Sequence, residues 1–391
     1  MFKIVKVIFI NLSVLFGLLG IITVGPLIAQ VSFDAIQRFN PWEENRVQLA
    51  KNTKIDNRPK LTVYDDVDWA EEYFSERLNV PIDYKDFITW RKGAHRSRTI
   101  NIDENGIRRT VPKNENSPNE IWLFGGSTVW GNGVDDSNTI ASHLAKISGA
   151  KVINFGEDGY ISRQSLNMLI KAYNRKKSEK NISVIFYEGA NDGAGHCVAG
   201  ETYIHTDREY QIQAKMKNLR TENVIDFKST FRNTLLFLNK LKYKLGVHQV
   251  RTKETFWNCD KSPARAEFIA NALVNDWTYA QKITETNGDF FLAILQPVLH
   301  LSKTEHAHLK GIKSGPFDPS GIFEIIKKQF STVYPKIRES VALSDIRFLD
   351  FSPVLDINEP IYIDPLHLSH YGNSLIAREM YKKLKDFGRL Q

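Results

Sequence analysis

Short apolar segments alternate with longer segments of helical periodicity through the C-terminal part of this 391-residue chain, and this alternation limits the folds open to it. Strands joined by crossover helices form a parallel sheet that is covered by helices on both faces. With right-handed connections, the sequence predicts an α/β fold, a three-layer α/β/α sandwich around a five-stranded parallel sheet. The expected strands are residues 121–124, 152–155, 183–187, 290–297 and 346–351, and the expected helices are residues 139–148, 164–175, 263–286, 322–338 and 369–385.

The first expected strand ends in a glycine pair followed by Ser127, in the run IWLFGGSTVWG that begins at Ile121. A serine on a tight turn at the carboxyl end of a strand exposes its hydroxyl group, as a nucleophile requires. Near the end of the chain, the sequence DPLH places Asp364 three residues before His367. A carboxylate this close can fix the tautomer of the imidazole while the other ring nitrogen faces the serine. We therefore expect a catalytic triad of Ser127, His367 and Asp364.

Two further strands are followed by groups that can donate hydrogen bonds to an oxyanion. The strand at 152–155 leads into a glycine-rich turn that ends at Gly159, where a backbone N–H is not shielded by a side chain. The strand at 183–187 is followed by the sequence EGAND, which contains Asn191. We expect an oxyanion hole formed by the N–H of Ser127, the N–H of Gly159 and the side chain of Asn191.

Each of these segments also has a simpler interpretation when it is taken alone. A glycine pair before a serine is common in loops, and an asparagine after a strand can be part of a polar turn. The segment around Asp364 precedes an expected helix, so Asp364 or Ser369 could serve as an N-terminal cap. Catalysis is favoured because the segments follow apolar strands, and the carboxyl ends of strands are where open α/β sheets place their sites.

The four segments, in this order, resemble blocks I, II, III and V of the SGNH (GDSL-like) hydrolase superfamily over about residues 119–388. The resemblance implies a flavodoxin-like sheet and a serine esterase, a hydrolase that acts on ester bonds through an acyl-serine intermediate. The superfamily's nucleophile, glycine, asparagine, acid and base fall on Ser127, Gly159, Asn191, Asp364 and His367.

One position departs from the superfamily pattern, because Gly126 stands where an aspartate often precedes the serine. This departure fits a branch with a Gly-Gly-Ser-Thr opening and affects the substrate class rather than the chemistry. The resemblance implies an O-acetyl ester on a carbohydrate or envelope glycan as substrate. An O-acyltransferase, a lipase or lysophospholipase, and a non-enzymatic glycan-binding or assembly protein on a hydrolase scaffold are the alternatives.

The N-terminal segment differs in character from the rest of the chain. Residues 7–28 include no charged side chain, and 22 residues in a helix span about 33 Å, enough to cross a bilayer. Lys3 and Lys6 precede this segment and the next basic residue is Arg38, so we expect a cytoplasmic N-terminus and an extracytoplasmic catalytic domain, periplasmic or extracellular. A cleaved signal peptide is the alternative, although its apolar core is normally shorter.

We expect a membrane anchor at residues 1–30, a stalk and accessory segment at 31–118, and the hydrolase domain at 119–391. Within the accessory segment, residues 66–78 have helical spacing and residues 99–111 are typical of a hairpin. The arginines of this segment either pack beside the first strand or contact an acidic substrate. They are Arg96, Arg98, Arg108 and Arg109.

An insertion at residues 196–262 contains both cysteines, Cys197 and Cys259. An even number of cysteines in an extracytoplasmic domain favours a disulfide between them, and two buried free thiols are the alternative. The insertion is basic, and residues 231–245 are expected to form an amphipathic helix. This helix is either an ordinary lid or a surface for anionic lipid or acidic glycan, and nucleic acid is not expected. No cofactor or metal motif occurs in the sequence, so neither is expected.

Overall fold

The computed structural model describes residues 56–176, 182–197 and 258–390. The chain divides into two units, of which one comprises Asp56–Glu209 and Lys253–Gln391. The other unit, Met1–Ile55 with Tyr210–Thr252, lies outside the described residues, and so do the predicted anchor and the predicted basic helix. Among the helices that the structure describes, none is both long enough and apolar enough to cross a membrane.

Five parallel strands form the central sheet, in the order β6-β5-β7-β8-β9. Every residue of β5 and β7 is buried, as expected for strands that are covered on both faces. The predicted five-stranded parallel sheet is therefore confirmed. The strands are β5 (Glu120–Gly125), β6 (Lys151–Asn154), β7 (Ile182–Glu188), β8 (Phe290–Leu295) and β9 (Phe348–Asp350).

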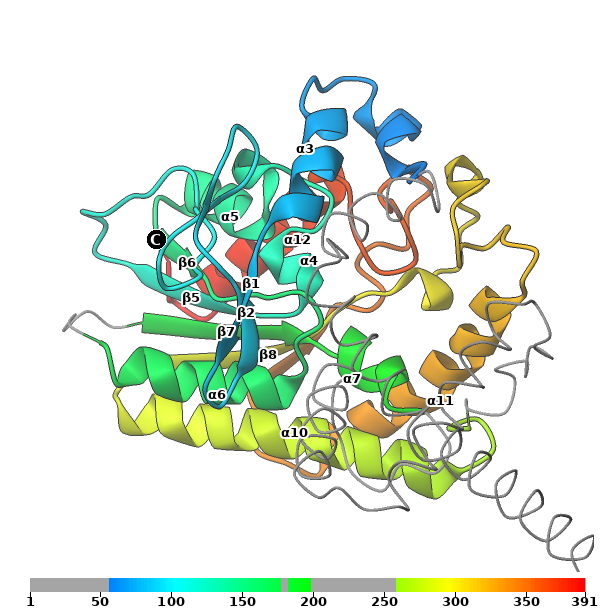
Figure 1. The fold of residues 1–391 in the computed structure, drawn as a ribbon. Coiled ribbons are helices and arrows are strands. Elements are labelled where there is room, and N and C mark those ends of the chain that lie inside the picture. Colours follow the sequence, from blue (N-terminus) through cyan, green and yellow to red (C-terminus); the bar gives the residue numbers. More distant parts are fainter. Residues whose placement is uncertain (1–55, 177–181, 198–257, 391) are drawn as a thin grey trace, which may run out of the picture. The chain divides into compact units, whose positions relative to one another are not determined.

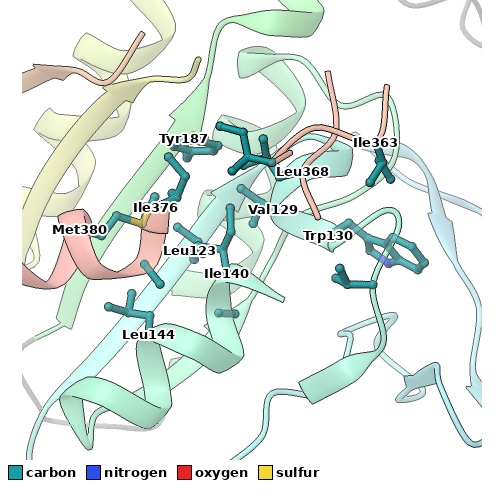
Figure 2. Close-up of a cluster of buried hydrophobic side chains, with 14 of the residues drawn as sticks. Leu123, Val129, Trp130, Ile140, Leu144, Tyr187, Ile363, Leu368, Ile376 and Met380 are labelled. Atoms are coloured by element: carbon teal, nitrogen blue, oxygen red, sulfur yellow. The ribbon is translucent and has the colours of Figure 1, made fainter. Parts of the chain in front are cut away.

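Helices cover both faces of this sheet, which gives the predicted three layers (Figure 1). Adjacent strand residues point to opposite faces, so Leu123 and Phe124 belong to different hydrophobic clusters. Figure 2 shows the cluster that contains Leu123, with Leu144 from one covering helix and Met380 from the other. One face is covered by α5 (Ile140–Ser148) and α12 (His370–Asp386), and the other by α6 (Ser162–Tyr173), α10 (Pro263–Thr286) and α11 (Ile322–Ala342).

The described part of the predicted stalk, residues 56–118, is packed on the sheet domain and belongs to the same unit. Tyr64 and Trp69 join the cluster beside α5 and α12, and Trp90 joins the cluster on the opposite face. Residues 56–118 and the sheet domain thus form one compact unit, and packing beside the sheet was one of the two roles expected for this segment. Its elements are α3 (Ala70–Glu76) and two short antiparallel pairs, β1 (Ile82–Lys85) with β2 (Thr89–Lys92) and β3 (His95–Arg96) with β4 (Asn101–Ile102).

Candidate active site

Ser127 lies at the carboxyl end of β5, where the short helix α4 (Ser127–Trp130) begins. The chain goes from β5 to β6 on one side and then returns to β7 on the other side of β5. This reversal is the point at which open α/β sheets bind their ligands. Ser127 is half-buried, whereas the other residues of α4 are buried. The fold therefore holds the serine rigidly and leaves its side chain partly accessible.

The structure brings the three predicted triad residues together in one chain of hydrogen bonds. The Oγ atom of Ser127 lies 2.7 Å from Nε2 of His367. On the other side of the ring, Nδ1 of His367 lies 2.8 and 2.7 Å from the two carboxylate oxygens of Asp364. Nδ1 must carry the proton, since a carboxylate only accepts, and this leaves Nε2 to accept the hydroxyl proton. This is the geometry of a serine hydrolase triad.

Asp364 is surrounded by hydrogen-bond donors. Its Oδ1 accepts the backbone N–H groups of Leu366 and His367 at 3.0 and 2.9 Å, and its Oδ2 accepts Nη1 of Arg58 at 2.9 Å. Burial by itself would raise the pKa of Asp364, but His367 and then Arg58 hold the pKa of this carboxyl well below its usual range. Asp364 is therefore ionised at neutral pH. Ser369 is the cap of α12, so the capping and catalytic interpretations of this segment both apply.

Asn191, one of the predicted oxyanion donors, lies beside Gly126. A Cβ atom on Gly126 would lie 2.5 Å from Nδ2 of Asn191, so the amide lies directly against the residue before the nucleophile. The same Nδ2 donates to the backbone oxygen of Tyr160 at 2.7 Å, next to Gly159. An amide nitrogen has two hydrogens, so one is left for an oxyanion. Gly159 has a φ of +77°, a left-handed conformation that favours glycine.

Asn132 and Arg58 contact the triad and Gln296 contacts the neighbouring Thr128, and none of these three residues was predicted from the sequence. Nδ2 of Asn132 lies 3.4 Å from Nε2 of His367, and Nε2 of Gln296 lies 3.4 Å from Oγ1 of Thr128. Gln296 directly follows β8, but the expected strand at residues 290–297 included it, so its place at the end of the strand could not be predicted. Arg58 could not be predicted either, because it is separated from Asp364 by 306 residues.

Opposite charges fix the turn that carries Gly159. The buried Lys92 donates to Glu157 at 3.3 Å through its ammonium group and at 2.8 Å through its backbone N–H, and it also pairs with Asp158. Nη2 of Arg77 lies 3.6 Å from Asp158. Burial would raise the pKa of Asp158, but Lys92 and Arg77 hold it well below the usual range. This part of the site therefore depends on residues that precede the sheet domain in sequence.

Two arginines of the accessory segment, Arg108 and Arg98, differ in their surroundings: the first is buried and the second is exposed. Arg108 is completely buried, pairs with Asp136 at 2.9 Å, and donates to the backbone oxygens of Trp130, Gly131 and Val134. It fixes the loop after α4, so a contact between Arg108 and substrate is excluded. The exposed Arg98 pairs with two carboxylates of its own segment, at 2.6 Å each.

Cys197 and Cys259 are bonded to each other, with their Cα atoms 5.1 Å apart. The bond joins the segment after α7 (Ala190–Gly195), which carries Asn191, to the segment before α10. Both sulfurs are buried, and the residues between them, 198–257, lie outside the described ranges. In the part of the chain that the structure describes, no cluster of three or more His, Cys, Asp or Glu side chains is placed to hold a metal ion.

A pair of buried carboxyl groups lies behind Asn191. Burial, and then the neighbouring Asp192, raise the pKa of Glu188 to about 8. Burial raises the pKa of Asp192 to about 7, although Ser162 donates to it through its backbone N–H and its hydroxyl group. Glu188 and Asp192 flank the segment that carries the oxyanion donor Asn191.

Comparison with family models found no match, and comparison with curated proteins found none either. Solved structures of similar fold include a lipolytic protein of the G-D-S-L family from Veillonella parvula, 15% identical, covering 69% of this chain and 99% of its own, with a TM-score of 0.38. A carbohydrate acetylesterase family member from Sinorhizobium meliloti is 14% identical, covering 68% of this chain and 97% of its own, with a TM-score of 0.37. A putative arylesterase from Agrobacterium tumefaciens is 18% identical, covering 68% and 99%, with a TM-score of 0.37. Similarity at this level carries no argument about activity, which is inferred from the site itself.

Proposed function

We propose that this protein is a serine esterase that hydrolyses its substrate through an acyl-serine intermediate. The observation that carries the proposal is the unbroken path from Oγ of Ser127 through His367 to the ionised Asp364, with distances of 2.7 Å on both sides of the ring. This path gives the serine proton a destination at the moment when the oxygen attacks a carbonyl carbon.

In the proposed mechanism, Ser127 attacks the ester carbonyl while its proton moves to Nε2 of His367. The negative charge that forms on the carbonyl oxygen is stabilised by the N–H groups of Ser127 and Gly159 and by the second hydrogen of the Asn191 amide. Loss of one such donor raises the barrier by about 3–4 kcal/mol. His367 then returns the proton to the leaving alcohol, and water repeats the sequence to release the acid.

For the substrate, we propose an O-acetyl group on a carbohydrate outside the cytoplasm. The superfamily resemblance of the sequence supports the O-acetyl ester. The predicted anchor supports the location, since the basic residues precede residues 7–28 and the catalytic residues follow them. The disulfide between Cys197 and Cys259 also supports it, because disulfides persist in oxidising compartments.

The proposal is tested by giving the full-length protein an aryl acetate and an O-acetylated glycan and measuring acetate release. Replacing Ser127 with alanine should lower the rate by several orders of magnitude and leave the melting temperature nearly unchanged. Ser331→Ala, at an exposed serine of α11, is the matched control and should keep the wild-type rate. Activity that survives in the Ser127→Ala variant would remove the assigned nucleophile, and transfer of acetate to a sugar hydroxyl would identify an acyltransferase.

A further inference from the structure

Arg58 forms ion pairs with two carboxylates, those of Asp364 and Asp56. Its Nη1 binds Oδ2 of the triad acid Asp364 at 2.9 Å, whereas its Nε and Nη2 bind Oδ1 and Oδ2 of Asp56 at 3.0 and 2.7 Å. The guanidinium group also lies over the ring of Phe74, 5.0 Å from its centroid, and the side chain is 16% exposed. Every part of the planar group is therefore held in place.

Arg58 supplies a hydrogen-bond donor to Oδ2 of Asp364, an atom that neither backbone donor of the triad loop binds. The two backbone donors of the triad loop both bind Oδ1 of Asp364, while Oδ2 shares the imidazole proton and otherwise accepts from Arg58. Without the guanidinium group, the carboxylate could turn about its last bond and move Oδ2 away from the ring, leaving Nδ1 of His367 with Oδ1 alone, at 2.8 Å. Loss of that orientation would affect the tautomer and the basicity of His367.

We propose that Arg58 is a positioning residue for the triad and that Asp56 and Arg58 together set the pH at which His367 becomes a base. The inference rests on the proposed function. The negative charge of Asp364 lies against the ring, the positive charge of Arg58 is bound to Asp364, and the negative charge of Asp56 is bound to Arg58. Arg58 binds the triad acid directly and is 16% exposed, whereas Asp56 is 41% exposed and more strongly screened by water, so we expect the charge of Arg58 to have the larger effect.

Other ionisable groups lie near His367 or Asp364, and we expect each of them to keep its charge when Arg58 is altered. Asp158 lies near His367 and keeps its own partners Lys92 and Arg77. His300 lies near Asp364, and its pKa is lowered to about 4, mainly by burial, so it is neutral. Burial raises the pKa of the neighbouring Tyr64 well above its usual value, so it is also neutral.

The test measures the pH dependence of inactivation by diethyl 4-nitrophenyl phosphate, which phosphorylates an activated serine and does not require the natural substrate. The full-length protein is compared with Arg58→Met, Arg58→Lys and Asp56→Asn. Arg98→Met is the matched control, because Arg98 also binds two carboxylates but lies outside the site and is 52% exposed. Mass spectrometry locates the phosphoryl group on Ser127.

The variants should shift the acid limb of the profile in opposite directions. Arg58→Met removes a positive charge, so the limb should move to higher pH by about one unit, and the plateau rate should fall. Asp56→Asn removes a negative charge, so the limb should move to lower pH by a smaller amount. Arg58→Lys keeps the positive charge but loses the planar guanidinium group, so it should lower the plateau rate and leave the acid limb nearly in place. Arg98→Met should change neither the plateau rate nor the position of the acid limb.

An unmoved limb in Arg58→Met, or shifts of the same sign in Arg58→Met and Asp56→Asn, would overturn the inference. If Arg58→Met does not fold, the downward shift in Asp56→Asn and the plateau in Arg58→Lys still decide it. A wild-type protein that is not phosphorylated on Ser127 would refute the proposed function itself. Phosphorylation of Ser127 with an unmoved limb would refute the role of Arg58 alone.

Discussion

Replacement of Gly126 by alanine should disturb the oxyanion hole by displacing one side chain, that of Asn191. The new Cβ atom would lie 2.5 Å from Nδ2 of Asn191 and 3.4 Å from the backbone oxygen of Tyr160. The backbone of Gly126 has a φ of −82°, which any residue can adopt, so the strand and the nucleophile need not move. The strain falls on the Asn191 amide, which must move away.

The size of the effect follows from the contacts of that amide. Non-bonded heavy atoms prefer separations of about 3.5–4.0 Å, so Nδ2 must move by roughly 1 Å and its bond to Tyr160 is lost. Loss of an oxyanion donor lowers kcat by about 10²–10³-fold. Loss of the hydrogen bond to the Tyr160 oxygen lowers the free energy of unfolding by only about 1 kcal/mol. Activity should therefore fall far more than stability.

The assay is kcat for an aryl acetate in four proteins: wild type, Gly126→Ala, Asn191→Ala and the double variant. Gly126→Ala should add almost nothing in the Asn191→Ala background, because both changes remove the same donor. Gly195→Ala is the matched control, since a Cβ atom there meets nothing within 4 Å. Wild-type kcat in Gly126→Ala, or full additivity in the double variant, would refute the assignment of Asn191.

Two further predictions concern the loop that carries Asn191. Because the pKa values of Glu188 and Asp192 are raised to about 8 and about 7, the folded state binds more protons than the unfolded state above about pH 4, so stability should fall as pH rises towards 8. Melting temperatures across this range check the prediction, and an equally steep decline in Asp192→Asn would contradict it. Reduction of the Cys197–Cys259 bond, which closes a separation of 62 residues, should lower stability by about 4 kcal/mol and lower activity as well. Denaturant unfolding with and without reductant measures the loss, and two thiols alkylated in the unreduced protein would rule out the bond.

Local sequence patterns were enough to predict the sheet and the triad. The helix expected at residues 263–286 is α10 with the same bounds, because its apolar spacing and its initial proline are local signals. Ser127 and the pair Asp364 and His367 each lie in a short segment whose form depends on neighbouring residues. Site residues were therefore predictable from sequence where neighbouring residues alone determine both the reactive group and the backbone conformation around it.

The contribution of residues 56–118 was not predictable in the same way. Lys92 and Arg108 are buried, yet a charged residue in a polar, proline-broken segment is typical of a surface. Their partners lie 65 and 28 residues away in the chain, and Arg58 reaches over 306. Only the folded structure shows that these charges are paired, because the pairing depends on how distant segments pack.

This pairing means that the sheet domain cannot be separated from the segment before it. A chain that began at Asn119 would leave carboxylates at three places without their cations: Asp136 without Arg108, Glu157 and Asp158 without Lys92, and Asp364 without Arg58. Breaking one buried pair in this way costs about 3–5 kcal/mol. Three such losses are comparable with the whole stability of an ordinary domain, about 5–15 kcal/mol. The smallest unit able to fold and to act therefore begins no later than Arg58, and residues 119–391 fused to another N-terminal segment would carry the triad without the cations that stabilise it.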